Sequence, residues 1–251
     1  MAEAMETRAA LPAPPPLADL KAGGPVALFL DFDGTLVEIA PTPDSINVPG
    51  SLGDRLEVLA ASLEHRLALV SGRSIEDIEH HLGSLAVARA GSHGAARQTA
   101  TGEWLGEAPQ PLADDIRSRL QEFAADEGLN YERKPHGAAL HFRSAPELEA
   151  AAVAFAARLA EGHGLEIKTG KCVVELVHAG ANKGDAVFAF MKNPPFAGSR
   201  PIFVGDDVTD EDGFRACAEI GGTGILVGER RDSSAQFRLS SVAAVHQWLG
   251  L

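Results

Sequence analysis

Two aspartates follow directly after a short, fully apolar run near the start of the chain. The run covers residues 26–30 (VALFL), and the acids are Asp31 and Asp33 in the hexapeptide DFDGTL. An apolar run of this length, bounded by turn residues, is typical of a strand buried in a parallel sheet. Ligands in open α/β folds bind at the carboxyl ends of such strands, so the pattern predicts a sheet whose functional edge carries both acids. Gly34 then allows a sharp turn.

This pair of acids points to phosphoryl-transfer chemistry. One carboxylate can attack phosphorus as a nucleophile while the other protonates the leaving oxygen as a general acid. A hard divalent cation such as Mg²⁺ would relieve the repulsion between the two carboxylates and would bind phosphate oxygens. A simpler interpretation stays open, because Asp and Gly are also common in ordinary turns. It explains the glycine but not two acids after one apolar run.

The composition is that of a globular protein with one large domain, or with a core and a smaller second domain. The 251 residues are 45% hydrophobic and 23% charged. The formal charge of −13 argues against a nucleic-acid partner or an anionic membrane surface, and no apolar stretch is long enough to span a bilayer. The two cysteines, Cys172 and Cys217, are expected to be reduced, buried thiols.

The first 24 residues are interpreted as a leader outside the folded domains. They are rich in Ala and Pro, with LPAPPPL at residues 11–17, and they lack the basic start and continuous apolar stretch of a secretory signal. We expect residues 1–24 to be flexible or polyproline-like and the protein to be a cytoplasmic monomer.

Short apolar runs alternate with amphipathic segments in the first and last parts of the chain, which predicts βαβ units and a parallel sheet. The expected elements are strands at 26–30, 67–70, 201–204 and 224–227 and helices at 52–64, 74–82, 182–191 and 211–219.

The middle of the chain has a different sequence pattern, in which two expected helices alternate with pairs of short alternating runs that are joined by polar turns. Such runs indicate antiparallel hairpins, so we expect a compact α+β insert. The expected helices are 111–127 and 146–161, and the expected hairpins pair 130–134 with 138–143 and 165–169 with 172–178.

A second polar motif, Ser71-Gly72-Arg73, follows the second expected strand. Parallel strands share one crevice at their carboxyl ends, where a hydroxyl and a guanidinium can both hold phosphate oxygens. Equally, Ser71 could cap a helix and Arg73 could be a solvated loop residue.

An acidic cluster, GDDVTDED at residues 205–212, follows a third expected strand. A charge run is usually a solvated loop. Here, however, it would supply the ligands that Asp31 and Asp33 lack for a closed Mg²⁺ shell. Lys183, earlier in the chain, would neutralise the nucleophile and the transferring phosphoryl group.

The four motifs DFDGTL, SGR, NKG and GDDVTDED, in that order, resemble those of the haloacid dehalogenase superfamily phosphatases. The resemblance covers about residues 26–227. It implies the fold class α/β: a Rossmann-like parallel-sheet core, residues 25–108 and 181–251, with an inserted smaller α+β cap domain, residues 109–180. It also implies a reaction through an aspartyl-phosphate.

The superfamily resemblance assigns a role to each motif. It implies that Asp31 is the nucleophile and a metal ligand, and that Asp33 is the general acid and base, with its backbone carbonyl on Mg²⁺. The implied catalytic residues are Asp31, Asp33, Ser71 and Lys183, with Gly72 and Arg73 near the substrate. The implied metal residues are Asp31, Asp33, Asp206 and Asp207, supported by Asp210.

The residue identities within and around these motifs resemble those of trehalose-6-phosphate phosphatases, in which the insert is a mobile cap that binds the sugar. The similar segments are GDDVTDED, GSHG at 91–94, ERK at 132–134 with HFR at 141–143, and GKCVVEL at 170–176. The family often carries Arg-Pro where this chain has VHAG at 177–180. The implied substrate contacts are His93, Gly94, Arg133, His141, Arg143, Lys171 and Glu175.

Some of these residues also allow a simpler interpretation. Arg133 and Lys171 could be surface charges near turns, and His93 and His141 could be buried side chains bonded to backbone groups.

The resemblance implies Mg²⁺-dependent hydrolysis of trehalose 6-phosphate to trehalose and phosphate in trehalose biosynthesis, and it allows a functional association with a trehalose-phosphate synthase. Two alternatives stay open. The substrate could be another sugar phosphate, of the sucrose 6-phosphate or mannosyl phosphoglycerate type, or the chain could be a non-catalytic regulatory domain that binds a sugar phosphate.

Overall fold

The computed structural model of the chain describes residues 11–40, 45–170, 172–180, 182–230 and 232–251. The chain divides into two compact units. The core unit joins the chain up to Gly106 with Asn182–Leu251, and the insert unit is Glu107–Ala181. Within the described ranges, every helix is too short or too polar to cross a bilayer.

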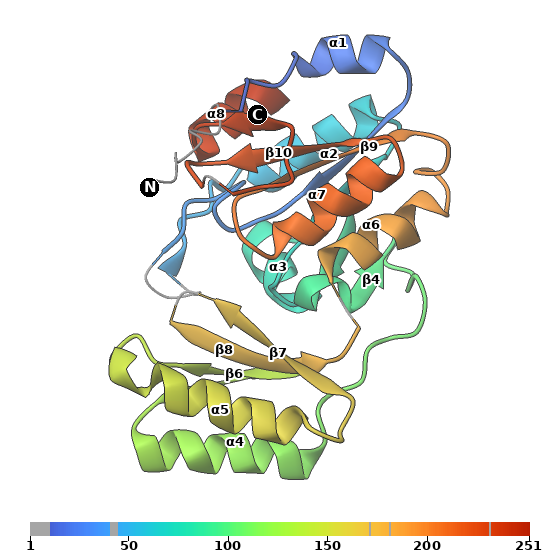
Figure 1. Ribbon diagram of the computed structural model, residues 1–251. Coiled ribbons are helices and arrows are strands. Elements are labelled where there is room, and N and C mark those ends of the chain that lie inside the picture. Colours follow the sequence, from blue (N-terminus) through green and yellow to red (C-terminus); the bar gives the residue numbers. More distant parts are fainter. Residues whose placement is uncertain (1–10, 41–44, 171, 181, 231) are drawn as a thin grey trace, which may run out of the picture. The chain divides into compact units, whose positions relative to one another are not determined.

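A sheet of seven strands lies at the centre of the core unit (Figure 1). Its strands are β1 (Val26–Leu30), β2 (Leu67–Val70), β3 (Ala88–Gly91), β4 (Ala96–Gln98), β9 (Arg200–Gly205), β10 (Thr223–Val227) and β11 (Phe237–Leu239). The order is β11-β10-β9-β1-β2-β3-β4, and only the pairing of β3 with β4 is antiparallel. The strand order therefore reverses between β1 and β9, the position at which such sheets bind ligands.

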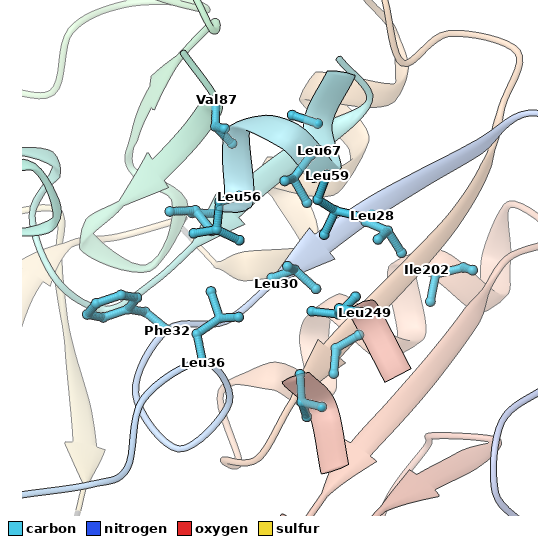
Figure 2. Close-up of a cluster of buried hydrophobic side chains, with 14 of the residues drawn as sticks. Leu28, Leu30, Phe32, Leu36, Leu56, Leu59, Leu67, Val87, Ile202 and Leu249 are labelled. Carbon is cyan, nitrogen blue, oxygen red and sulfur yellow. The ribbon is translucent and has the colours of Figure 1, made fainter. Parts of the chain in front are cut away.

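The helices of the core unit form a layer on each face of this sheet. They are α1 (Leu17–Ala22), α2 (Leu52–Ser62), α3 (Ile75–Leu82), α6 (Lys183–Met191), α7 (Asp210–Glu219) and α8 (Val242–Leu249), with a 3₁₀ turn, η2 (Ser92–Gly94). Leu28 and Leu30 pack with Leu56 of α2 and Leu249 of α8 (Figure 2). Phe29 points to the other face, where α6 and α7 pack. Because both faces of β1 are covered, the strand is apolar throughout.

The structure confirms the α/β class and the expected core strands and helices, and it adds elements that the pattern did not indicate. The additions are α1, β4, η2, β11 and α8. Of these, β4 and β11 are the edge strands of the sheet, α1 and α8 lie near the chain termini, and η2 joins β3 to β4. Ser74 caps α3 by accepting a hydrogen bond from the backbone N–H of Asp77 at 3.1 Å. Both thiols are free, and Cys217 is buried as expected, but Cys172 is only half-buried because it lies in a turn between two strands of the insert unit.

The expected flexible leader is wrong for the part that the structure describes, residues 11–24. Leu17 of α1 is buried against the core. The indole N–H of Trp248 donates to the carbonyl of Pro15 at 2.8 Å, and the backbone N–H of Arg238 donates to the carbonyl of Pro12 at 2.9 Å. The prolines hold extended backbone whose carbonyls accept these bonds, and Leu17 adds apolar burial. Residues 1–10 lie outside the described residues.

The insert unit contains a sheet of four antiparallel strands with both helices on one face (Figure 1). Its elements are α4 (Asp114–Glu127), β5 (Asn130–Lys134), β6 (Gly137–His141), the 3₁₀ turn η3 (Pro146–Leu148), α5 (Glu149–Ala160), β7 (Leu165–Gly170) and β8 (Val173–His178). The order is β5-β6-β8-β7, so both expected hairpins are confirmed. Ile116, Leu120, Leu140 and Leu176 fill the layer between helices and sheet.

Candidate active site

Asp31 and Asp33 lie after β1, as expected, but their side chains have different partners. The backbone N–H of Asp31 donates to the carbonyl of Val204 in β9 at 2.9 Å, which continues the β1–β9 pairing and buries Asp31. Gly34 has φ of +79°, and a Cβ there would lie 2.2 Å from Oδ2 of Asp206. Only glycine therefore allows this turn to pass so close to the acidic loop.

A buried lysine joins the nucleophile candidate to the acidic loop. The Nζ atom of Lys183 donates to Oδ1 of Asp31 at 2.7 Å and to Oδ1 of Asp210 at 2.6 Å. All three side chains are at most 5% exposed. Lys183 begins α6, and Asn182 caps that helix by accepting from the backbone N–H of Asp185 at 2.9 Å. The cap fixes the helix start and so places the lysine.

Three carboxylates gather around this lysine. Oxygen atoms of Asp31, Asp206 and Asp210 lie within 4.8 Å of one another, in a search of the described residues. With one ammonium among them, the group carries a formal charge of −2 when all are ionised. Oδ1 of Asp206 is buried and has no hydrogen-bond partner. A divalent cation would offset this charge and bind the unpaired oxygen, so the donor set fits a hard metal ion.

The acidic loop departs from expectation in the roles of two aspartates. Asp210 is fully buried, and its Oδ2 accepts from the backbone N–H of Asp207 at 2.8 Å. The Asp207 side chain is exposed and accepts from the backbone N–H of Val208 at 2.6 Å. Asp210 therefore joins the carboxylate cluster, whereas Asp207 stabilises the loop, because α7 begins at Asp210 and points that side chain inward.

The electrostatics of the cluster follow from burial and crowding. Burial, and next the charge of Asp210, raise the pKa of Asp31 well above its usual range, although Lys183 opposes this. Burial, with Asp210 and Asp207, raises the pKa of Asp206 to about 7. Burial disfavours the charge of Lys183, but Asp210 and Asp31 outweigh it and raise the pKa of the lysine. The lysine thus stays charged, and the carboxylates lack one further cation.

The Ser71-Gly72-Arg73 loop follows β2 and touches the turn after β3. The Ser71 hydroxyl is buried and accepts from the backbone N–H of Arg73 at 3.1 Å, while the carbonyl of Ser71 accepts from the N–H of His93 at 3.0 Å. A Cβ at Gly72 would lie 2.7 Å from the His93 ring, and one at Gly94 would lie 2.5 Å from the carbonyl of Asn182. The turn at 92–94 therefore packs between this loop and the start of α6.

The guanidinium of Arg73 contacts the carboxylates of Asp33 and Asp77. Its Nε and Nη2 donate to the two carboxylate oxygens of Asp33 at 2.6 and 2.8 Å. Its Nη1 donates to Asp77 at 2.6 Å. Each of the two acids of DFDGTL thus has its own cation, Lys183 for Asp31 and Arg73 for Asp33.

The predicted cap residues divide between the two faces of the insert sheet. Glu175 and His141 lie on the face opposite the helices, where His141 contacts Glu132 at 2.7 Å and Glu175 pairs with Lys134. Arg133 alternates with these residues along β5 and lies on the helix face, at the exposed edge strand. This placement argues against a shared contact surface for Arg133 and Glu175. Arg143 is exposed after β6, and Lys171 lies outside the described residues.

Several residues in these networks were not singled out from the sequence. Lys134 shares a sheet face with Glu175. Side chains alternate between the two faces along a strand, so the segment ERK at 132–134 would have indicated this if the pairing of β5, β6 and β8 had been known. Asp77, whose backbone N–H donates to Ser74 in the cap of α3, also accepts from Arg73 through its side chain. His81, one turn further along α3, contacts the same guanidinium.

Comparisons with known proteins find a matching family and similar sequences. The model of the trehalose-phosphatase family matches residues 29–243. The trehalose-6-phosphate phosphatase of Escherichia coli (strain K12) is 38% identical over 226 residues, which are 89% of this chain and 85% of the relative.

Two solved structures have the same fold. A trehalose-6-phosphate phosphatase related protein matches with a TM-score of 0.70 and 26% identity, over 90% of this chain and 95% of its own. The C-terminal domain of a Candida albicans trehalose-6-phosphate phosphatase matches with a TM-score of 0.77 and 22% identity, over 98% and 100%. With the family match over most of the sequence, these likenesses show that the chain belongs to the trehalose-phosphatase family.

Proposed function

We propose that this chain hydrolyses trehalose 6-phosphate to trehalose and inorganic phosphate. The observation that carries the proposal is the buried Lys183, held between Asp31 and Asp210 where the strand order of the sheet reverses. That arrangement gives a nucleophile, a fixed positive charge and an acidic cluster within one site. The family match and the name of the Escherichia coli relative support the choice of substrate.

The proposed metal is Mg²⁺, held by Asp31, Asp206 and Asp210. The choice rests on the all-oxygen donor set, the formal charge of −2 and the unpaired, buried Oδ1 of Asp206. When bound, the ion would offset negative charge on the carboxylates and on the phosphoryl oxygens. The exposed Asp207 is not included in this ligand set.

The residues of the core unit account for both halves of the reaction. Asp31 attacks phosphorus, the bond to the sugar oxygen breaks, and Asp33 gives that oxygen a proton. Asp33 then takes a proton from water, whose oxygen attacks the aspartyl-phosphate and restores Asp31 with release of phosphate. Lys183 and the Ser71 hydroxyl hold the phosphoryl oxygens, and the lysine charge persists throughout.

The proposed role of the insert unit is to recognise the sugar. The sheet face opposite the helices carries the carboxylates of Glu132 and Glu175, the ammonium of Lys134 and the ring of His141. Carboxylates accept hydrogen bonds from sugar hydroxyls, and an ammonium donates to hydroxyl or phosphate oxygens.

A phosphate-release panel tests the activity and the substrate together. The panel compares trehalose 6-phosphate, sucrose 6-phosphate, a mannosyl phosphoglycerate and glucose 6-phosphate, each with Mg²⁺ and with EDTA. We expect Mg²⁺-dependent release that is fastest with trehalose 6-phosphate. Preference for another sugar phosphate would change the substrate, and tight binding without release would favour a regulatory domain.

The nucleophile is tested with Asp31→Asn against Asp54→Asn, which alters an exposed aspartate of α2 in the same unit. We expect Asp31→Asn to lose phosphate release almost completely, whereas Asp54→Asn keeps the wild-type rate. Wild-type turnover by Asp31→Asn would overturn the assignment. A cytoplasmic location, a monomeric state and association with a synthase stay predictions.

A further inference from the structure

The side chain of Arg73 is enclosed in the core unit and makes a two-pronged ion pair with Asp33. Both carboxylate oxygens of Asp33 accept from it, at 2.6 and 2.8 Å. The Arg73 side chain is 8% exposed, whereas that of Asp33 is 34% exposed. A two-pronged pair fixes the plane of the carboxylate as well as its distance, so Arg73 determines how Asp33 is presented at the surface of the site.

Arg73 is held in turn from the side away from Asp33. Its Nη1 donates to Oδ2 of Asp77 at 2.6 Å and lies 3.2 Å from Nε2 of His81. Its guanidinium carbon lies 5.7 Å from the centre of the Phe32 ring. Burial disfavours the arginine charge, yet the hydrogen bonds and charges of Asp33 and Asp77 outweigh it and raise the pKa of Arg73. The contacts on both sides restrict the guanidinium to one orientation.

We propose that Arg73 is a positioning residue that orients Asp33 for proton transfer, with Asp77 as its anchor, and that it does not bind the substrate phosphate. The proposal rests on the proposed phosphatase function, in which Asp33 moves the proton. To reach a phosphate, the guanidinium would have to leave the two carboxylates with which it is paired, which is costly at a largely buried site. A lysine at this position would supply charge but not the planar fork.

The choice of leaving group separates positioning from phosphate binding. A sugar oxygen needs a proton as it departs, whereas p-nitrophenolate leaves as a stable anion, and kcat/KM reports on the steps up to that departure. For Arg73→Lys we expect kcat/KM for trehalose 6-phosphate to fall about 10- to 100-fold. We expect kcat/KM for p-nitrophenyl phosphate and the inhibition constant of inorganic phosphate to stay close to wild type.

A second variant leaves Arg73 itself unchanged. Asp77→Asn removes the negative charge of the anchor but keeps an oxygen that can accept from Nη1. We expect a loss of kcat/KM that is again selective for the sugar ester, but smaller. The matched control is Glu79→Gln on the same helix, which breaks another arginine–carboxylate pair, with Arg89 at 3.0 Å. We expect no selective loss in this control.

Two results would count against the inference. If Arg73→Lys weakens inhibition by inorganic phosphate and slows both esters equally, Arg73 binds phosphate and the inference is overturned. If Asp77→Asn and Glu79→Gln show the same kcat/KM values for both esters, Asp77 does not act as the anchor of Arg73. If the wild type releases phosphate from neither ester, the proposed function is wrong and the inference falls with it.

Discussion

Replacing Lys183 by methionine tests the electrostatic argument for the site most directly. The substitution keeps the length of the side chain and removes its charge, leaving Asp31, Asp206 and Asp210 with oxygens within 4.8 Å of one another. Two unit charges at that separation repel by about 3.5 kcal/mol at an effective dielectric constant of about 20. Removing one partner of a buried ion pair costs about 3–5 kcal/mol in measured cases. We therefore expect a loss of about 3–5 kcal/mol in unfolding free energy at pH 8 in EDTA.

The loss should shrink as the pH falls. Lys183 holds down the pKa values of Asp31 and Asp206, which already lie above their usual range in the folded state, so both rise further without it. A group whose pKa is raised on folding stabilises the protein at low pH, and this contribution is lost as the pH rises. The difference in unfolding free energy between the variant and the wild type should therefore become smaller from pH 8 to pH 5. Mg²⁺ should stabilise the variant more than the wild type, because it replaces the missing charge.

The assay is urea denaturation at pH 5 and pH 8, with EDTA or Mg²⁺, beside phosphate release. The control is Lys192→Met, which removes an exposed lysine just after the same helix. Lys183→Met should lower kcat at least about 10²-fold, the usual effect of losing one charge-stabilising donor. Equal unfolding free energies for Lys183→Met and Lys192→Met at pH 8 would refute the reasoning, since they would show that the buried charge is not needed.

Three further predictions concern packing, pH and the sugar. Gly205→Ala places a Cβ 2.2 Å from the Asp210 carboxyl carbon, so it should lower the unfolding free energy by about 1–3 kcal/mol and reduce activity. The control is Gly50→Ala, whose Cβ has nothing within 4 Å, and it should change neither quantity in the same denaturation and activity assays. In EDTA, the pKa of about 7 for Asp206 means that the folded state holds a proton that the unfolded chain has lost. Stability should therefore fall from about pH 4 to pH 7, and Asp206→Asn should flatten this slope in denaturation curves. Glu175→Gln should raise KM for trehalose 6-phosphate about 10-fold, because it removes one charge-assisted hydrogen bond, and it should leave p-nitrophenyl phosphate hydrolysis unchanged. An equal rise of KM in Arg133→Met would contradict the placement of Arg133 and Glu175 on opposite faces of the insert sheet.

The positions of the main elements were predictable because local patterns determine them. The apolar run at 26–30, the alternation in the hairpins and the cap at Ser74 each depend on residues close in sequence. The edge strands β4 and β11 are short, with weak patterns, and they form because the sheet offers them a partner. The ordered segment at 11–24 depends likewise on distant residues, Arg238 and Trp248.

The family could also be predicted from the sequence, and so could the positions of the candidate reactive residues. The motifs predicted that Asp31, Ser71, Lys183 and an acidic loop follow strand ends or begin helices, and parallel strands bring such positions to one edge of a sheet. The order of acids in GDDVTDED does not reveal which one faces inward. That depends on the start of α7 at Asp210 and on the space that Gly205 leaves beside it.

The partners of the charged side chains were decided only by the tertiary structure. From the sequence, Arg73 could equally bind phosphate or point to solvent. Asp77 lies only four residues further along the chain, but only packing brings Asp33 to the guanidinium. Arg133 lies one residue from Lys134, yet the pleat of β5 sends them to opposite faces of the sheet. Ionic contacts act between neighbours in space, and long side chains reach several angstroms from the backbone. The two acids after the first strand were therefore evident in the sequence, but the cation that each one holds was not.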